Sequence, residues 1–280
     1  MALRINYNLA ASAAQRGLAA SQDSYSKQAE HLSSGLRINR ASDDAAGLAV
    51  SEKLKNQVRG LNQAQRNAQD SISLIQTAEG ALTETHSLLA RMRELAVQSS
   101  NDTLTISDRA NLNAEFTHLY AEVDRIATST QFNTALLLNG SGTATALTFQ
   151  IGANNGDTLA LAIDGTQASV LNVAFNSANG VAGVAYQSSA SAVISILDVA
   201  VNVVSEDRAE LGAVQNRLES TIRSLAVASE NTSAANSRIA DADIAQSMSE
   251  MVRAQILQQA GISVLAQANQ APSLVLQLLK

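Results

Sequence analysis

Large apolar residues recur every seven positions in two segments, one in each half of the chain. A seven-residue spacing keeps a narrow stripe on one side of a helix, and such a stripe packs against another helix. We therefore predict a mainly α fold, in which the two chain ends meet as a long antiparallel helical bundle or coiled coil. The first row is Leu54, Leu61, Ala68, Ile75, Leu82 and Leu89; the second is Leu197, Val204, Leu211, Leu218, Leu225 and Ile239, with polar Thr232 between the last two.

Capping residues place the ends of the expected helices. Ser42 is the expected N-cap of the second helix, with Asp43 and Asp44 in its first turn, where the helix dipole favours negative charge. Ser107 with Asp108 begins the third helix, and Asp241 with Asp243 marks the start of the last. The expected helices cover residues 1–35, 45–100, 107–129 and 191–238, followed by an amphipathic stretch within 240–280.

The middle of the chain has a different pattern. The turn signals Asn139-Gly140 and Asn154-Asn155-Gly156-Asp157 flank alternating segments at 147–151 and 159–163. We predict a small β-hairpin region at about 140–190, whose end, residues 176–190, is an exposed connection rich in Ser, Ala, Gly and Asn.

The composition argues for assembly and against catalysis. Aromatic residues make up only 3% of the chain, so it lacks the bulky side chains that dominate globular cores, and neighbouring copies are expected to supply the missing burial. The absence of Cys excludes disulfides and thiolate sites, and a net charge of -6 argues against nucleic-acid binding. The residues show no catalytic grouping, cofactor motif or metal-ligand spacing; the histidines are His31, His86 and His118.

The sequence predicts neither a secretory signal peptide nor a membrane-spanning segment. The N-terminus lacks the apolar core of a secretory signal, and the longest apolar candidate, Val193–Val204, is too short to span a bilayer.

The last amphipathic stretch presents Ile244, Met248, Met251 and Ile256 on helical spacing. We predict that these four residues, together with the large residues of the two heptad rows, form the polymerisation seams.

Several longer blocks resemble one known family. They are residues 32–51 (LSSGLRINRASDDAAGLAVS), 66–70 (RNAQD), 77–82 (TAEGAL) and 93–99 (RELAVQS), then 208–218 (RAELGAVQNRL), 237–243 (SRIADAD), 255–260 (QILQQA) and 267–272 (QANQAP). These blocks resemble the bacterial flagellins, the subunits of the flagellar filament, over about 1–165 and 190–280. The chain is similar to a minimal member without large variable outer domains.

The resemblance implies how the subunit is built and used. Residues 1–44 with 240–280 would form the inner-tube layer of a hollow helical filament for motility, and residues 45–239 the outer core layer. Family members are exported unfolded through the flagellar type III system, without a cleaved signal peptide, to an extracellular filament. The implied partners are other copies of the chain, an export chaperone at the C-terminal helix, and the filament cap and hook-junction proteins.

The resemblance also implies a receptor site. In many flagellins an animal Toll-like receptor binds an Arg, a Leu and a Glu on the outer-layer helices, and the matching positions here are Arg91, Leu95 and Glu115. A Leu anchor flanked by charges of both signs is a common hot-spot arrangement. Subunit contacts within the filament are the other interpretation of these three residues.

Three alternatives to a filament subunit differ in testable ways. A hook–filament junction protein shares the terminal helices but would form only a short ring. A secreted adhesin or receptor-binding ligand would stay monomeric. An enzyme built into the filament would need an inserted catalytic domain, for which this chain has no room.

Overall fold

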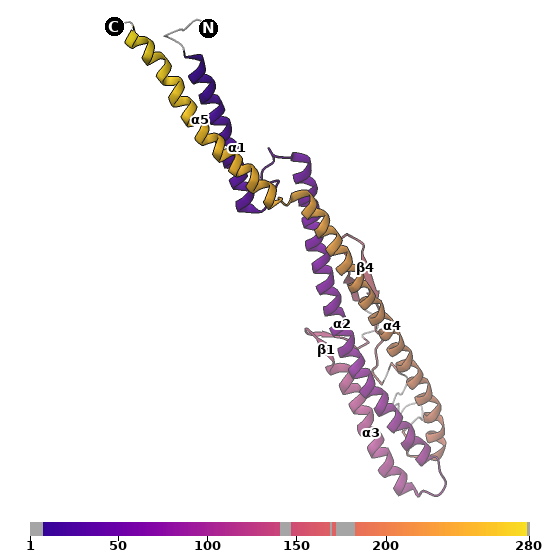
Figure 1. The fold of residues 1–280 in the computed structure, drawn as a ribbon. Coiled ribbons are helices and arrows are strands. Elements are labelled where there is room, and N and C mark those ends of the chain that lie inside the picture. The colour runs from indigo at the N-terminus through magenta and orange to yellow at the C-terminus, as the bar shows by residue number, and fades with distance from the viewer. Residues whose placement is uncertain (1–7, 141–146, 169, 172–182, 279–280) are drawn as a thin grey trace. The chain divides into compact units, whose positions relative to one another are not determined.

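A computed structural model describes residues 8–140, 147–168, 170–171 and 183–278 (Figure 1). The described elements are α1 (Leu9–Ser34), α2 (Ala45–Ser99), α3 (Ile106–Ser129), β1 (Gln131–Phe132), β2 (Ala135–Leu136), β3 (Leu147–Gln150), β4 (Thr158–Leu161), α4 (Gln187–Ala240) and α5 (Ile244–Leu278). The predicted mainly α fold with a small hairpin region in its middle is confirmed. Residues 176–182 of the expected exposed connection lie outside the described residues. The rest of it was wrongly predicted, because α4 begins at Gln187 and Val184 and Ala190 are buried in the core.

The chain forms two compact units. The terminal unit comprises residues 1–58 and 230–280, and the central unit comprises residues 59–229. This division falls inside α2 and α4, whereas the sequence placed it at the ends of these helices. Both units are therefore built from the two halves of the chain.

The central unit is organised by the antiparallel pairing of α2 and α4. Arg93 near the end of α2 meets Asp198 near the start of α4 at 2.6 Å, while Asn62 accepts a hydrogen bond from Ser229 at 2.9 Å. Between these points the heptad residues of both helices lie in a buried cluster, which α3 extends with Phe116. The heptad residues in this cluster are Ala68, Ile75, Leu82, Leu89, Leu197, Val204, Leu211 and Leu218.

Two small hairpins cover the central bundle. Strands β3 and β4 pair antiparallel, which confirms the predicted hairpin. Leu147 lies opposite Leu161 and Gln150 opposite Thr158. The β1–β2 hairpin was not predicted. Its turn residues Asn133 and Thr134 have φ of 47° and 66°, and a two-residue turn of this hand normally uses Asn-Gly or Asp-Gly, so Thr at the second position concealed it.

The terminal unit pairs α1 with α5. Asn8 caps α1 by accepting a hydrogen bond from the Ala11 N–H, and its amide donates to the Ala268 carbonyl near the far end of α5. At the other end of α1, Gln28 donates to Glu250 at 2.7 Å. In Figure 1 the two helices accordingly lie side by side along their length.

Two of the expected caps were displaced by a few residues. Asp44 caps α2 by accepting from the Gly47 N–H at 2.8 Å, so the expected cap Ser42 lies before the helix. Thr105 caps α3 in a reciprocal capping box with Asp108, in place of the expected Ser107. In both cases the cap lies two positions from the expected residue, two residues later at α2 and two residues earlier at α3, and periodicity does not distinguish such neighbouring positions.

Of the described helices, α4 has the length and apolar composition of a membrane span, which is weak evidence by itself. Leu197, Val204 and Leu211 on this helix are buried in the core of the central unit. The apolar stripe of α4 thus has a partner within the chain.

We predict that the stability of the central unit depends on the heptad residues of α4. Truncating buried Leu211 to Ala should reduce the free energy of unfolding by about 2–5 kcal/mol, because it leaves a cavity among packed helices. Val227→Ala, at a site 58% exposed on the same helix, should cost less than about 1 kcal/mol. Denaturant unfolding followed by circular dichroism measures both; equal losses would contradict this packing.

Candidate functional site

Nine of the residues predicted as polymerisation seams lie inside the subunit. They are buried in the central unit, at most 9% exposed, and contact other parts of the same chain: Leu61, Ile75, Leu82, Leu89, Leu197, Val204, Leu211, Leu218 and Leu225. Such residues stabilise the bundle and cannot contact a neighbouring subunit while the unit is folded. The remaining heptad residues, Leu54 and Ile239, are half-buried in the terminal unit.

The predicted seam residues on α5 are mostly exposed. Ile244 is 50% exposed, Met248 43% and Ile256 59%, whereas Met251 is half-buried. Sequence periodicity missed a further exposed set on the same helix, Leu257, Ile262 and Val264, and Val252 beside the predicted Met251 is exposed as well. These residues lie outside the predicted stripe, so α5 is apolar on more than one side. Large apolar residues on several faces of one helix were the sequence signal for this surface.

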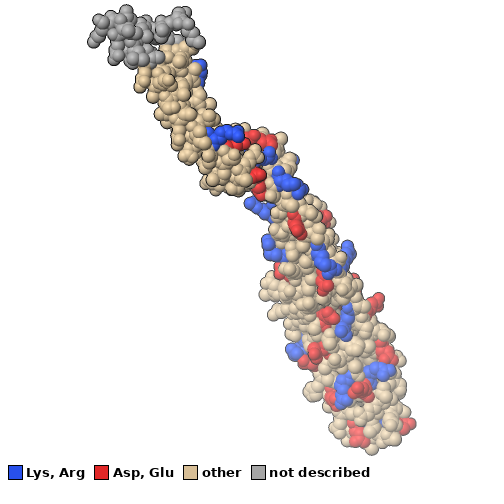
Figure 2. Space-filling model, viewed as in Figure 1, with Lys and Arg blue, Asp and Glu red and all other residues tan. Residues whose placement is uncertain are grey.

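Few charges accompany these apolar side chains. The only charged residues of α5 are Glu250 and Arg253. Figure 2 shows acidic and basic side chains interspersed along the central unit and few where α1 and α5 lie. A helix with apolar side chains on several faces, of which α1 covers one, presents the rest for a further partner.

The structure brings Arg91 and Glu115 together. The guanidinium of Arg91 on α2 donates from two nitrogens to Glu115 on α3, at 2.9 and 2.8 Å, and from a third to Glu94 at 2.9 Å. The hydrogen bonds that Arg91 donates to Glu115, followed by the one it donates to Glu94, raise the pKa of Arg91 above its ordinary value. Both partners of this interhelical pair are exposed to solvent.

Leu95 does not lie on that surface. It is 1% exposed and belongs to the core cluster of the central unit. Of the three residues that the resemblance assigns to receptor binding, the folded subunit therefore exposes Arg91 and Glu115 and buries Leu95. The spacing of four residues puts Leu95 and Arg91 on the same side of α2, but the shorter Leu95 side chain lies in the core cluster while the longer Arg91 side chain reaches solvent.

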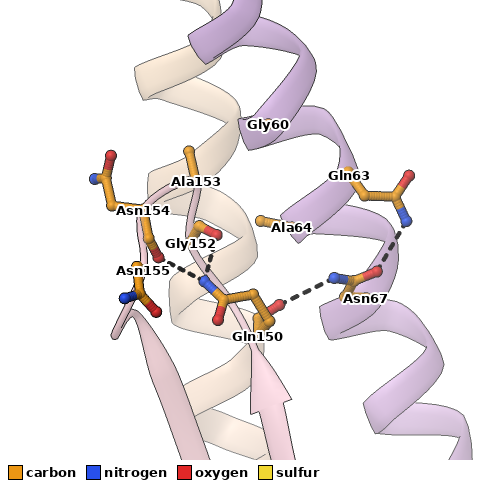
Figure 3. Close-up of a pocket in the computed structure, with 9 residues that line it drawn as sticks. All are labelled: Gly60, Gln63, Ala64, Asn67, Gln150, Gly152, Ala153, Asn154 and Asn155. Carbon is orange, nitrogen blue, oxygen red and sulfur yellow. Dashed lines mark hydrogen bonds between the residues drawn. The ribbon is translucent and has the colours of Figure 1, made fainter.

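An amide-rich hollow lies where the β3–β4 turn meets α2 (Figure 3). Its side chains bond to one another and to the turn: Asn67 donates to the Gln150 carbonyl, and the Gln150 amide donates to the carbonyls of Gly152 and Asn154. A Cβ at Gly60 would lie 3.0 Å from the Ala153 Cβ, so glycine permits this close approach. The hollow has a volume of about 330 Å³. The hydrogen bond from Asn67 to the Gln150 carbonyl joins the hairpin to α2 beside it.

Asp207 is a half-buried residue on α4 whose Oδ2 is shielded from solvent. Its Oδ2 has no hydrogen-bond partner among the residues that the structure describes. Burial raises the pKa of Asp207 to about 6, and the charges of Asp164, Glu210 and Glu206 contribute to the same rise. At neutral pH this site therefore holds an unpaired negative charge at a cost in stability.

We predict that Asp207→Asn stabilises the central unit at pH 7 by about 1 kcal/mol, a value reduced for the partial solvent screening of this group. Because the folded pKa lies above the unfolded value of 3.8, the wild-type penalty is full above pH 6. It falls to roughly half at pH 5 and disappears below pH 4. Denaturant unfolding of both proteins from pH 5 to 7.5 measures the difference.

Glu219→Gln, at an exposed carboxylate on the same helix, is the control for this measurement. It should leave the pH dependence of unfolding as in the wild type. A constant effect of Asp207→Asn across the pH range would show that the carboxylate is not strained by burial.

Family models match both ends of the chain. The bacterial flagellin N-terminal helical region matches residues 5–143, and the bacterial flagellin C-terminal helical region matches residues 194–279. The two matches contain all five helices apart from the first residues of α4. The β3–β4 hairpin lies between them.

Full-length relatives match as well. A flagellin of Halalkalibacterium halodurans is 51% identical over 276 residues, covering 99% of both chains. A flagellin of Bacillus subtilis is 45% identical over 304 residues, covering 99% of this chain and 100% of the relative.

Solved structures agree with the fold. The crystal structure of Bacillus cereus flagellin is similar with a TM-score of 0.51 and 31% identity, over 57% of this chain and 88% of that one. A putative flagellar hook-associated protein from Vibrio parahaemolyticus has a TM-score of 0.58 at 15% identity, over 71% of this chain and 100% of that one, and shares the fold alone.

Proposed function

This chain belongs to the bacterial flagellin family, and we propose that its exposed α5 surface makes the subunit contacts of the flagellar filament. It is a structural subunit of that extracellular filament. The observation that supports the proposed surface is the row of large apolar side chains that α5 leaves uncovered, among them Ile256 and Leu257, at 59% and 53% exposure. Covering each such side chain contributes about 1.5–3 kcal/mol.

One contact surface, repeated from subunit to subunit, is enough to build a long polymer. A head-to-tail contact that does not close into a ring generates a helical filament, in which every copy buries the same surface. We place the terminal unit, including the expected 1–44 and 240–280 segments, in the inner-tube layer. The central unit, whose apolar residues are largely buried within the subunit, forms the outer core layer.

Before assembly no neighbouring subunit covers the apolar side chains of α5, so another protein has to bind them. We propose that an export chaperone holds residues 240–280 while the chain travels unfolded through the type III system without a cleaved signal. The filament cap and hook-junction proteins meet the two ends of the polymer, where subunit surfaces lack a neighbouring copy. A junction protein is the less favoured identity for this chain, because relatives named flagellin match it at 45–51% identity over their full length.

We predict that Ile256→Ser raises the critical concentration for polymerisation by about 10- to 100-fold, since it removes one covered apolar side chain per contact. Gln259→Ser, at an exposed polar site on the same helix, should leave it unchanged. Sedimentation of seeded monomer gives the critical concentration, and electron microscopy distinguishes long tubes from short rings or monomers.

Removing residues 240–280 extends this test to the whole surface. The truncated chain should stay soluble with its central helices intact. Native filaments from that chain, or an unchanged critical concentration in Ile256→Ser, would contradict the proposed α5 contacts.

We further propose that Arg91 and Glu115 lie within the surface that a flagellin-binding Toll-like receptor recognises. The proposal rests on the family resemblance and on the exposed, paired geometry of the two side chains. Leu95 acts here as a support, because it fills the core beneath α2. A filament contact at the same pair is compatible with this role if the receptor binds the released monomer.

We predict that Arg91→Ala weakens receptor binding by the folded monomer at least about tenfold, as expected when one partner of an interfacial charge pair is removed. Glu115→Ala should act in the same direction, and Arg66→Ala, at an exposed arginine elsewhere on α2, should have little effect. Surface plasmon resonance measures the affinities. Leu95→Ala should lose thermal stability as well as binding; lost binding at full stability would show that Leu95 contacts the receptor directly.

A further inference from the structure

The chain contains three Asn-Gly sequences, at 139–140, 155–156 and 179–180. The third lies outside the described residues, and the other two lie in loops of the central unit. Asn-Gly is a reactive pair, because the glycine nitrogen can attack the side-chain amide of the preceding asparagine and no Cβ on the glycine hinders the approach. The two described pairs have different surroundings, so the fold decides which of them reacts.

Asn155 lies in the exposed turn between β3 and β4. The Asn155 side chain and the Gly156 N–H make no hydrogen bond to the residues that the structure describes. Figure 3 accordingly shows the Asn155 side chain at this turn with no dashed line to its neighbours. Gly156 has a φ of 93°, and a Cβ built there would meet nothing within 4 Å. Both reacting groups are therefore free to move toward each other.

Asn139 and Gly140 are held in place by contacts on both residues. The Asn139 side-chain oxygen accepts a hydrogen bond from the Gln167 amide, and both Asn139 and Gly140 are half-buried. Gly140 packs so closely against Gly165 that a Cβ on either glycine would clash with the Cα of the other. Attack by the Gly140 nitrogen would require the side chain of Asn139 to turn away from Gln167 and the glycine backbone to move. This pair can react only after the loop opens locally.

We propose that Asn155 is a site of spontaneous deamidation, in which the Gly156 nitrogen attacks the Asn155 side chain and ammonia leaves. Hydroxide removes the proton from the Gly156 N–H, and the nitrogen forms a bond to Cγ of Asn155. The Cγ–Nδ2 bond then breaks, and Nδ2 takes up a proton from water and leaves as ammonia. Water opens the resulting cyclic imide at either of its carbonyls, which gives aspartate or isoaspartate. No atom is oxidised or reduced, and water is the only co-reactant.

The product places a negative charge in the amide-rich hollow. None of the nine residues that line the hollow is charged (Figure 3). The new carboxylate lies two positions from Asp157, whose own carboxylate accepts from the Asn154 backbone N–H at 3.2 Å and from its side-chain amide at 3.3 Å. Isoaspartate also lengthens the backbone of this turn by one methylene. A subunit that has aged in this way therefore differs in charge from a newly made one.

The test uses the soluble full-length monomer, incubated at mildly alkaline pH and physiological temperature. Chymotryptic cleavage after Phe149 separates the two sites, and mass spectrometry of the peptides follows the conversion of each amide to an acid. Asn155 should convert at least about tenfold faster than Asn139, because reaction at Asn139 first has to break the hydrogen bond that holds it. In denaturant the two rates should agree within about threefold, since the difference arises from the fold.

Two variants serve as matched controls. Gln167→Ala removes the hydrogen bond to Asn139, so it should raise conversion at Asn139 about three- to tenfold and leave the rate at Asn155 unchanged. Asn155→Gln keeps an amide at the exposed turn but requires a larger ring for the same attack, and it should show no conversion there. An unchanged rate at Asn139 in Gln167→Ala would contradict the protection assigned to this hydrogen bond.

The products identify the route of the reaction. Electron-transfer fragmentation distinguishes isoaspartate from aspartate; the cyclic imide gives both, whereas direct hydrolysis of the amide gives aspartate alone. Equal conversion of Asn139 and Asn155 in the folded chain, protection of Asn155 relative to the denatured chain, or aspartate as the sole product at position 155 would overturn the proposal. None of these measurements depends on the proposed α5 contacts, because the chain is studied as a monomer.

Discussion

The antiparallel packing of α2 against α4 is the interaction on which the central unit depends. It joins residues more than 100 positions apart in the chain, such as Arg93 and Asp198. The seam places leucines beside fully buried alanines, among them Ala68 and Ala200, which lets two helices approach closely without aromatic side chains. With so few aromatics in the chain, no wider core was available. Helix α3 and the two hairpins then cover the flanks of this seam, and the ion pairs of Arg91 and Arg93 fix its two sides at the surface.

The two units solve the burial problem differently. Three helices and a hairpin enclose most large apolar side chains of the central unit. Two helices cannot do so, because each covers only one face of the other, and α5 carries apolar residues beyond that face. Among the described residues of the terminal unit, the buried ones other than Ile38 and His31 are small, such as Ala254 and Ser247. A unit of this kind gains most of its stability from neighbours, which is consistent with a structural subunit of a polymer and with ordering on assembly.

Periodicity predicted the helices, their order and the β3–β4 hairpin, because each follows from side chains within one segment. It was less accurate at the ends of α2 and α3, where several capping residues compete, and it missed the β1–β2 turn, whose positive φ at Thr134 has no ordinary sequence signal. The heptad rows correctly predicted contacts between helices. An apolar stripe does not state whether its partner helix belongs to the same chain. The buried Leu82 and the exposed Ile256 were therefore both predicted to lie in polymerisation seams. The burial of Leu95 likewise depends on packing within the chain, which its spacing from Arg91 does not state.

Because Leu95 is buried, a receptor that binds the folded subunit contacts Arg91 and Glu115 without it. Arg91 and Glu115 belong to different helices, and their bidentate contact exists only while α2 and α3 are packed together. Leu95 helps to maintain that packing from below. A receptor that recognises the pair therefore recognises the folded central unit and needs nothing from α1 or α5. On the proposed functions, the terminal unit responds to neighbouring subunits and the central unit presents its charged surface whether or not the terminal helices are ordered. If both proposals hold, the division of the chain into two units lets assembly and recognition use separate surfaces.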